Sequence, residues 1–483
     1  MSPLGILTVI ACYFLLILVI SYFTGRHTDN AGFFIGNRQS RWFVVSFGMI
    51  GASLSGVTFI SVPGWVVDSQ FSYMQMVLGY LLGYFIIARV LLPVYYRLNL
   101  TSIYTYLEER FGFWSYKTGA TFFLISRIIG ASFRLYLVAS VLQITVFDSM
   151  GVPFIITVVI TILLIWLYTS RGGIRTIIWT DVLQTVFMLV AVILTIVLIA
   201  RASDLDLKGL AGAITNSRYS RMFFFDDWTS RNFFVKQFLA GAFIAVVMTG
   251  LDQDMMQKNL SCRNLAEAKK NVLWLSVLLV PVNLVFLSLG VLLVYFAGRS
   301  GMDLPSMSDD LFPLVAAGGY LAPVVTVFFV IGLVAAAYSS ADSALTALTT
   351  SFTVDILGGL HKGEEVLGRI RKRMHVLVSV LLLGVIVLFR LINDRSVIDA
   401  LFTAAGYTYG PLLGIYAFGL FTGWKVRDRL VPLVCIMSPL CSYLLSHYSA
   451  RLLNGYHFGF ELLVINGLFT FLGLLLIARF RQA

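Results

Sequence analysis

Long apolar runs, separated by short polar segments, cover most of this chain. A helix needs about 20 mostly apolar residues to cross a hydrocarbon core of about 30 Å, whereas a β-barrel would show alternating segments of about 10 residues. The pattern predicts an all-α polytopic membrane protein with about thirteen transmembrane helices, and with residues 1–483 forming a single transmembrane domain. The expected spans are 4–24, 43–66, 73–96, 118–147, 152–170, 174–200, 233–258, 271–298, 320–352, 374–392, 397–421, 429–449 and 459–480.

Basic residues favour one orientation of these spans. If the N-terminus lies outside, the inner loops and the C-terminus collect most of the 35 Lys and Arg residues, with the densest cluster at 369–373. Because cytoplasmic loops of membrane proteins are enriched in Lys and Arg, we expect the N-terminus outside and the C-terminus inside. The expected location is the cytoplasmic membrane.

Composition narrows the function classes. Hydrophobic residues make up 59% of the chain and charged residues only 12%, about half of the charged share of a soluble protein. The net charge of +11 follows from this asymmetry of the loops and from contact with the lipid bilayer, so we expect no nucleic-acid partner. A paired His/Glu metal motif and a Ser–His dyad at mid-membrane depth are both lacking, so we do not expect an enzyme.

Residues 334–348, VAAAYSSADSALTAL, place polar side chains inside an apolar run. Small polar residues often join transmembrane helices through hydrogen bonds, which is the structural alternative. A lone carboxylate adds nothing to such packing, whereas hydroxyl and carboxylate oxygens suit a hard cation. The segment therefore predicts an ion-binding helix face. Five positions share that face by their spacing: Ser339, Asp342, Ser343, Thr346 and Thr350.

The second expected span predicts a broken helix. Residues 46–65 contain three glycines and a Pro-Gly pair, interleaved with hydroxyl side chains, and glycine and proline both weaken helices. A break near mid-membrane frees carbonyls that can bind Na⁺ and N–H groups that can hold a polar or anionic solute. The alternative is an unbroken helix that packs closely through its small residues.

Ionisable side chains inside the spans need partners, because one charge at mid-membrane costs about 2.5–3.5 kcal/mol on insertion scales. They face a cavity, pair with each other or extend towards a membrane surface. Arg127 and Arg134 are seven residues apart on one helix face, where they either bind an anionic solute or pair with carboxylates. Among the ionisable residues within the expected spans are Arg89, Arg127, Arg134, Asp181, Asp252, Asp254, Asp342 and Asp399.

Taken in order along the chain, these motifs resemble the sodium:solute symporter family. The resembling segments are the glycine- and serine-rich second span, GGIRTIIWTD, DQDMMQK and AAAYSSADSALTALTTSFTVD. The resemblance covers nearly the whole chain and implies a LeuT-type core of two inverted five-helix repeats. On that pattern residues 43–200 form the first repeat and 233–421 the second. The remaining spans, 4–24, 429–449 and 459–480, would be peripheral helices.

The resemblance also implies site residues. The hydroxyls and the broken span would meet at a main sodium site, and some members of the family bind a second ion with an aspartate and further serines. Asp342 departs from the serine found in the two-ion sialic-acid members, and Gly130 occupies the place of their carboxylate-binding arginine. The implied main-site residues are Gly51, Leu54, Ala336, Ser339 and Ser340. The implied second-site residues are Asp181, Ser339, Asp342 and Ser343. The implied solute-contacting residues are Ser53, Ser55 and Thr58, with Arg127 or Arg134 as a replacement for the arginine.

We therefore expect a secondary active transporter that couples Na⁺ to a small polar organic solute, either a carboxylate or a sugar, by alternating access. A second Na⁺ between Asp181 and Asp342 would balance two carboxylates that repel each other at low dielectric. The alternative to this second ion is one sodium together with one shared proton, so the sequence leaves one or two coupled sodium ions open. The rival within transport is proton coupling through the same two aspartates. A channel or a receptor with this fold is the alternative outside transport.

Overall fold

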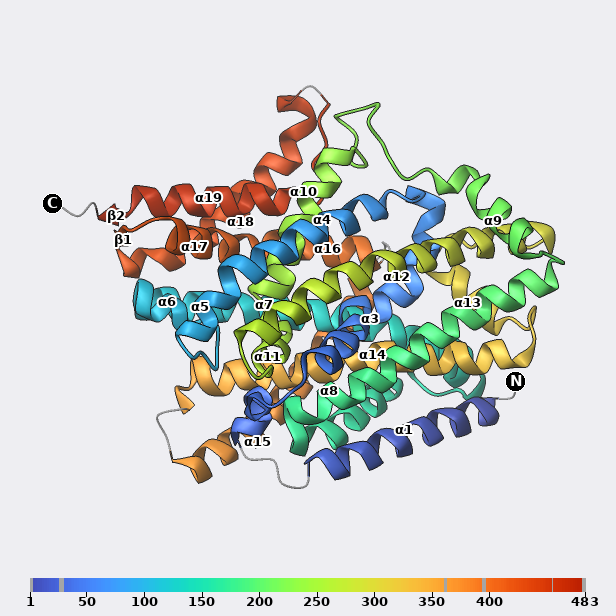
Figure 1. The fold of residues 1–483 in the computed structure, drawn as a ribbon, viewed down its shortest axis with the longest axis horizontal. Coiled ribbons are helices and arrows are strands. Elements are labelled where there is room, and N and C mark those ends of the chain that lie inside the picture. Colours follow the sequence, from blue (N-terminus) through green and yellow to red (C-terminus); the bar gives the residue numbers. More distant parts are fainter. Residues whose placement is uncertain (1–2, 26–29, 360–362, 393–396, 454, 480–483) are drawn as a thin grey trace.

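The protein is a bundle of helices that lie side by side (Figure 1). The computed structural model describes residues 3–25, 30–359, 363–392, 397–453 and 455–479. The long helices are α1 (Pro3–Gly25), α3 (Trp42–Ser69), α4 (Tyr73–Ile86), α7 (Phe113–Leu142), α8 (Phe154–Ala202), α10 (Phe234–Ala245), α12 (Leu265–Arg299), α14 (Pro323–Ser351), α15 (Glu364–Ile392), α16 (Val397–Thr408), α17 (Gly410–Phe421), α18 (Val431–Leu452) and α19 (Leu462–Leu476).

Short elements connect these helices. A two-stranded antiparallel sheet pairs Lys425 with Arg479 and Val426 with Ala478, which joins the segment after α17 to the segment after α19. The short helices are α2 (Asn30–Ile35), α5 (Leu92–Arg97), α6 (Thr105–Arg110), α9 (Leu207–Thr215), α11 (Gln253–Leu260) and α13 (Leu311–Ala317), and the strands are β1 (Lys425–Val426) and β2 (Ala478–Arg479).

Within the described residues, nine helices are long and apolar enough to cross a membrane, or ten if the bent pair Phe234–Gly250 and Gln253–Leu260 is one span. Three shorter apolar helices, Phe154–Ser170, Gly410–Phe421 and Leu462–Leu476, coincide with further expected spans. The multi-pass all-α architecture predicted from the sequence is therefore confirmed.

Three interruptions shape the bundle. The backbone of α3 leaves the helical conformation at Ser55, where φ is 49° and ψ is 170°. The long element α8 reverses at Gly173, where φ is 52°, a value that glycine adopts without a steric penalty. The axes before and after Leu251 differ by 66°, and Asp252 caps the helix that follows by accepting a hydrogen bond from Asp254 N. The break predicted in the second span is thus confirmed.

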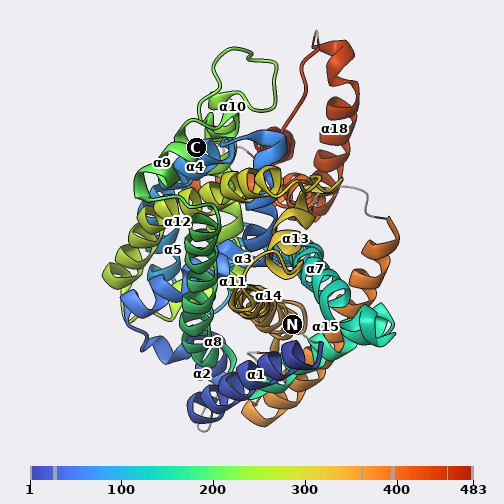
Figure 2. The ribbon, with the colours of Figure 1, turned by 90° about the vertical axis from the view of Figure 1, so that its right-hand side faces the viewer.

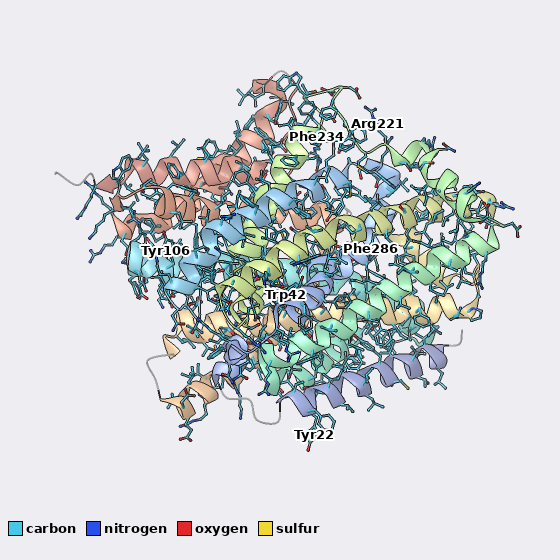
Figure 3. All side chains as sticks on the ribbon, viewed as in Figure 1. Tyr22, Trp42, Tyr106, Arg221, Phe234 and Phe286 are labelled. Carbon is cyan, nitrogen blue, oxygen red and sulfur yellow. The ribbon has the colours of Figure 1, made fainter. Side chains whose placement is uncertain are left out.

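Helix α14 lies at the centre of the bundle. Viewed end-on, it is surrounded by α1, α3, α7, α8 and α15 (Figure 2). All residues from Gly332 to Ser351 are buried. Side chains on the lateral surface are largely apolar, as for Tyr22, which projects outward from α1 (Figure 3). The polar stripe of α14 is therefore in the protein interior, away from lipid.

Close helix approach depends on glycine where α4 meets α10. A Cβ added at Gly79 would lie 2.0 Å from the carbonyl oxygen of Phe238, so one backbone rests directly on the other. Contacts of this kind between small residues are a common way for transmembrane helices to associate.

We predict that Gly79→Ala lowers the melting temperature, because the added methyl group forces α4 and α10 apart at a cost of about 1–3 kcal/mol. Gly384→Ala is the matched control, since a Cβ there meets nothing within 4 Å. Melting followed by size exclusion in detergent measures both variants. Equal melting temperatures for the two variants would contradict this account of the contact.

Candidate functional site

The break in α3 rests on α8. Gly51 N donates to Thr185 Oγ1 over 3.0 Å, and Thr185 Oγ1 donates to the carbonyl of Asp181 over 2.8 Å. A Cβ at Gly51 would come within 2.4 Å of Thr185 Oγ1, so this approach requires glycine. Thr185 therefore ties the turn of α3 that precedes the break to α8.

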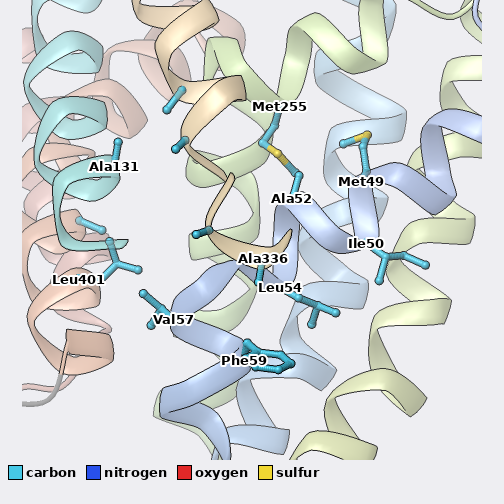
Figure 4. Packing of buried hydrophobic residues seen from close by; sticks show 14 of the residues in the cluster. Met49, Ile50, Ala52, Leu54, Val57, Phe59, Ala131, Met255, Ala336 and Leu401 are labelled. Carbon is cyan, nitrogen blue, oxygen red and sulfur yellow. The ribbon is translucent and has the colours of Figure 1, made fainter. Parts of the chain in front are cut away.

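Helix α14 faces the break from the other side. A Cβ at Gly56 would lie 3.7 Å from Ala337 Cα, and Ala336 lies beside Leu54 and Val57 (Figure 4). Ser340, on the same helix, is 1% exposed, and its Oγ lacks a hydrogen-bond partner among the described residues. A buried, unpartnered hydroxyl oxygen next to a broken helix suits a cation that is coordinated by oxygen.

Asp181 of α8 accepts two contacts from other helices. Lys258 Nζ of α11 lies 2.7 Å from Asp181 Oδ2, and Ser339 Oγ of α14 donates to Oδ1 over 2.6 Å. The side chains of Lys258 and Asp181 are each 1% exposed. This buried ion pair therefore joins α8, α11 and α14.

Asp342 lies on the same contact between α14 and α8. Tyr168 OH of α8 donates to Asp342 Oδ2 over 2.9 Å, and Ser343 Oγ donates to Oδ1 over 3.2 Å. Asp342 is 0% exposed. None of the described basic side chains forms a salt bridge with it, so this carboxylate depends on hydroxyl donors alone.

The two arginines of α7 differ in their partners. Arg127 forms a close ion pair with Asp254 and lies 3.8 Å from Asp252, which also accepts a hydrogen bond from Tyr409 OH. Arg134 is 7% exposed. Among the described residues it has neither a salt bridge within 4.0 Å nor a side-chain hydrogen bond, and its Nε is buried without a partner.

A cavity of about 80 Å³ lies between the break in α3 and these arginines. All five predicted solute-contacting residues line it, together with three tyrosines of α4 and residues of α10, α12 and α16. The lining is Ala52, Ser53, Leu54, Ser55, Val57, Thr58, Tyr73, Tyr80, Tyr84, Arg127, Arg134, Ile244, Ala245, Met248, Thr249, Met255, Leu279, Asn283, Leu401 and Phe402.

Aromatic side chains separate this cavity from a larger one of about 540 Å³ that contains Asp68 and Arg231. Phe402 lines both cavities. Its ring centroid lies 5.0 Å from that of Phe460 and 6.5 Å from that of Tyr73. The small cavity is thus closed towards the larger one by a layer of rings, as expected for a solute site with a gate.

The structure brings together most residues that the sequence indicated. Leu54 and Ala336 lie beside each other where α3 contacts α14 (Figure 4), Ser339 and Ser340 follow on α14, and Gly51 contacts Thr185 of α8. Asp181, Asp342 and Ser343 lie along the neighbouring contact between α8 and α14. Their roles as sodium ligands stay predictions. Sequence reasoning missed Lys258, Tyr168 and Thr185. Lys258 was the last residue of an expected span, where a lysine commonly extends to the membrane surface, so nothing in the pattern marked it as buried.

The profile of the sodium:solute symporter family matches residues 33–426, which is more than half of the chain. This protein belongs to the sodium:solute symporter family. The resemblance seen in the sequence is confirmed, and the chain is a multi-pass, sodium-coupled transporter.

Individual relatives agree with this membership. The chain is 28% identical to the sodium/sialic acid symporter NanT of Aliivibrio fischeri over 83% of its own length and 79% of that protein. It is 27% identical to the sodium-coupled monocarboxylate transporter 1 of Mus musculus, covering 82% of this chain and 65% of that protein. These relatives are transporters rather than enzymes.

The fold also matches a solved structure. A Na⁺-coupled sialic acid symporter in a substrate-bound, outward-open state superimposes with a TM-score of 0.83 and 19% sequence identity, covering 98% of each chain. The LeuT-type fold predicted from the sequence is therefore confirmed for this symporter.

We predict that Arg127→Met lowers the melting temperature strongly, because it leaves Asp254 buried without its cation, at a cost of about 3–5 kcal/mol. The double variant Arg127→Met/Asp254→Asn should recover most of the loss, since neither charge then remains unpaired. Melting of the purified protein measures the recovery. A double variant as unstable as the single variant would show that the ion pair is not the cause.

Proposed function

We propose that this symporter uses sodium to import a compact organic anion across the cytoplasmic membrane, with its N-terminus outside and its C-terminus inside. The observation that carries the anion is Arg134, a buried guanidinium on the central cavity without an ion-pair partner among the described residues. The concentration of Lys and Arg in the loops on one side supports the orientation.

A solute carboxylate would supply the charge that Arg134 lacks. A guanidinium binds a carboxylate through two parallel N–H···O bonds, and at low dielectric this pairing is much stronger than it is in water. Arg127 lines the same cavity but already pairs with Asp254 and lies 3.8 Å from Asp252, so it contributes shape and hydrogen bonding. Arg134, which has no salt bridge among the described residues, therefore favours an anion over a neutral sugar.

The cavity also limits the size of the solute. One water molecule needs roughly 10–15 Å³ of cavity volume. A cavity of about 80 Å³ therefore suits a compact solute. The solutes of two relatives, sialic acid and monocarboxylates, both carry an acidic group, which supports this class. Among them the small volume favours a short monocarboxylate, with the tyrosines of α4 against its apolar part.

Sodium would bind where α3 and α14 cross. Carbonyl oxygens of Gly51, Leu54 and Ala336 and the hydroxyls of Ser339 and Ser340 are the proposed ligands. An ion bound there would join the broken helix α3 to α14. It would favour the state of the transporter in which these oxygens lie together, by as much as its affinity for that state exceeds its affinity for the other. Closing the break also positions Ser53, Ser55 and Thr58 on the solute cavity.

Each of the two proposed repeats begins with a broken helix. Residues 43–200 begin with the broken helix α3, and residues 233–421 begin with the pair α10 and α11, which is bent by 66°. Broken helices at equivalent positions of two repeats are the usual site-forming device of such transporters, and both breaks border the central cavity. We propose these two segments as the inverted repeats, with 4–24, 429–449 and 459–480 as peripheral helices.

We predict that Arg134 makes the protein bind a carboxylic acid more tightly than the corresponding neutral amide. A thermal-shift panel in sodium should find stabilisation by a short carboxylic acid and none by the corresponding neutral amide. Arg134→Lys should weaken binding of that acid on the order of tenfold, because lysine lacks the two-pronged geometry. Arg89→Lys, at an exposed position that does not line the cavity, is the control. Equal binding of acid and amide, unaffected by Arg134→Lys, would contradict the proposal that the solute is an anion.

We predict that Ser339→Ala/Ser340→Ala raises the sodium concentration for half-maximal uptake by at least about tenfold, because two of the proposed ligand oxygens are lost. Ser442→Ala removes a buried hydroxyl that bonds only to Ser438 O in α18, and it should leave sodium dependence unchanged. Uptake measured against a sodium titration in proteoliposomes checks both. Identical sodium dependence in the double variant would exclude this crossing as the coupling site.

A further inference from the structure

Three ionisable side chains lie together at the contact of α8, α11 and α14 with almost no exposure. Asp181 and Lys258 are each 1% exposed and Asp342 is 0% exposed. Asp181 and Asp342 are joined through α14, since Ser339 contacts the first carboxylate and Asp342 follows three residues later, roughly one helical turn. With both aspartates ionised, the group carries two negative charges and one positive charge.

Lys258 holds the position from which a second metal ion would have to approach Asp181. Its Nζ lies 2.7 Å from Oδ2, and Ser339 already donates to Oδ1. Both oxygens of Asp181 are thus engaged by the protein itself. An ammonium group is a compact point charge with three donors, so it can meet a carboxylate in the way that a monovalent ion does.

We propose that the ammonium of Lys258 takes the place of a second sodium ion, so that this symporter binds one sodium, whereas the sequence alone leaves one or two open. The proposal rests on the proposed sodium site at Gly51, Leu54, Ala336, Ser339 and Ser340. One sodium there and one ammonium on Asp181 balance the two carboxylates, and a second sodium would add an uncompensated positive charge in the interior.

The location of Lys258 makes this cation permanent. Residue 258 lies on α11, which begins directly after the bend at Leu251 and is capped by Asp252. A covalently attached cation stays with the protein through the transport cycle, whereas a bound sodium ion is released with the solute. As a consequence, one sodium ion rather than two enters the cell with each solute.

The carboxylate of Asp342 is the negative charge that Lys258 does not pair with. It has no salt bridge among the described residues and accepts hydrogen bonds only from Tyr168 and Ser343. Lys258 compensates Asp181, so Asp342 supplies the net negative charge that attracts the single sodium to the adjacent hydroxyls. Removing the charge of Lys258 should leave one negative charge in excess and open a position for a second ion.

Equilibrium binding of ²²Na⁺ to the purified full-length protein tests the count directly. Wild type should bind one sodium per chain, with a Hill coefficient of about one. Lys258→Gln should bind two, with a Hill coefficient that approaches two, because the vacated charge position on Asp181 is filled by sodium. Lys258→Arg retains the positive charge and should still bind one.

A second variant covers the case in which Lys258→Gln does not fold. Asp181→Asn/Lys258→Gln removes both members of the ion pair, leaves no buried excess charge relative to wild type, and should bind one sodium. Two sodium ions in wild type, or an unchanged count of one in folded Lys258→Gln, would overturn the role of Lys258.

The same experiment separates this proposal from the proposed function. Loss of sodium binding in Ser339→Ala/Ser340→Ala, together with a count of two in wild type, would leave the main sodium site standing and refute only the substitution by Lys258. Sodium binding that is unchanged in Ser339→Ala/Ser340→Ala would refute the main site itself, and the proposal for Lys258 with it.

Discussion

Charge buried inside a membrane protein has to be balanced by the protein or by its ligands, because neither lipid nor bulk water can do so. In this symporter the balance is nearly complete. Asp181 has Lys258, and Asp254 has Arg127, so two ion pairs hold α11 against α8 and α7. Asp252, which lies 3.8 Å from the same Arg127, adds a further buried carboxylate. Asp342 and Arg134 both lack a salt bridge among the described residues. These two charges correspond in sign to the two proposed cargoes, a sodium ion and an organic anion.

The break in α3 connects these two places. Its first half lies on α8, where Gly48 would bring a Cβ within 3.0 Å of Asp181 Cβ and Gly51 bonds to Thr185. Its second half lies on α14 next to Ala337. The interruption at Ser55 falls between them, and the same turn lines the solute cavity. Sodium bound as proposed between α3 and α14 would therefore also shape the cavity, which would couple sodium binding to solute binding.

Much of this arrangement could be predicted from the sequence because it follows from local chemistry. Glycines and hydroxyls at 46–65 weaken one helix, and a polar stripe on an apolar run, led by Asp342, indicates an ion-binding face. The pairing of charges could not be predicted in the same way. Arg127 and Asp254 are far apart in the chain, and only tertiary packing decides that Arg127 rather than Arg134 receives the carboxylate.

Lys258 is the residue whose role was hardest to predict from the sequence. In the sequence it ends an apolar run, where a lysine normally reaches the membrane surface. The 66° bend before α11 turns this end of the span into the protein, so the same residue becomes a buried cation. Tyr168 and Thr185 were missed for a related reason, because a neutral hydroxyl inside an apolar helix acquires a role only when a carboxylate or a broken helix lies opposite.

The central claim is that sodium joins the broken helix α3 to α14. Hydrogen–deuterium exchange of the purified protein, in sodium and in an equal concentration of choline, tests it most directly. The account predicts that sodium slows exchange in peptides covering 51–58 and in peptides covering 334–343 together, with the same sodium dependence. Unchanged exchange in both segments, or protection of one without the other, would contradict it.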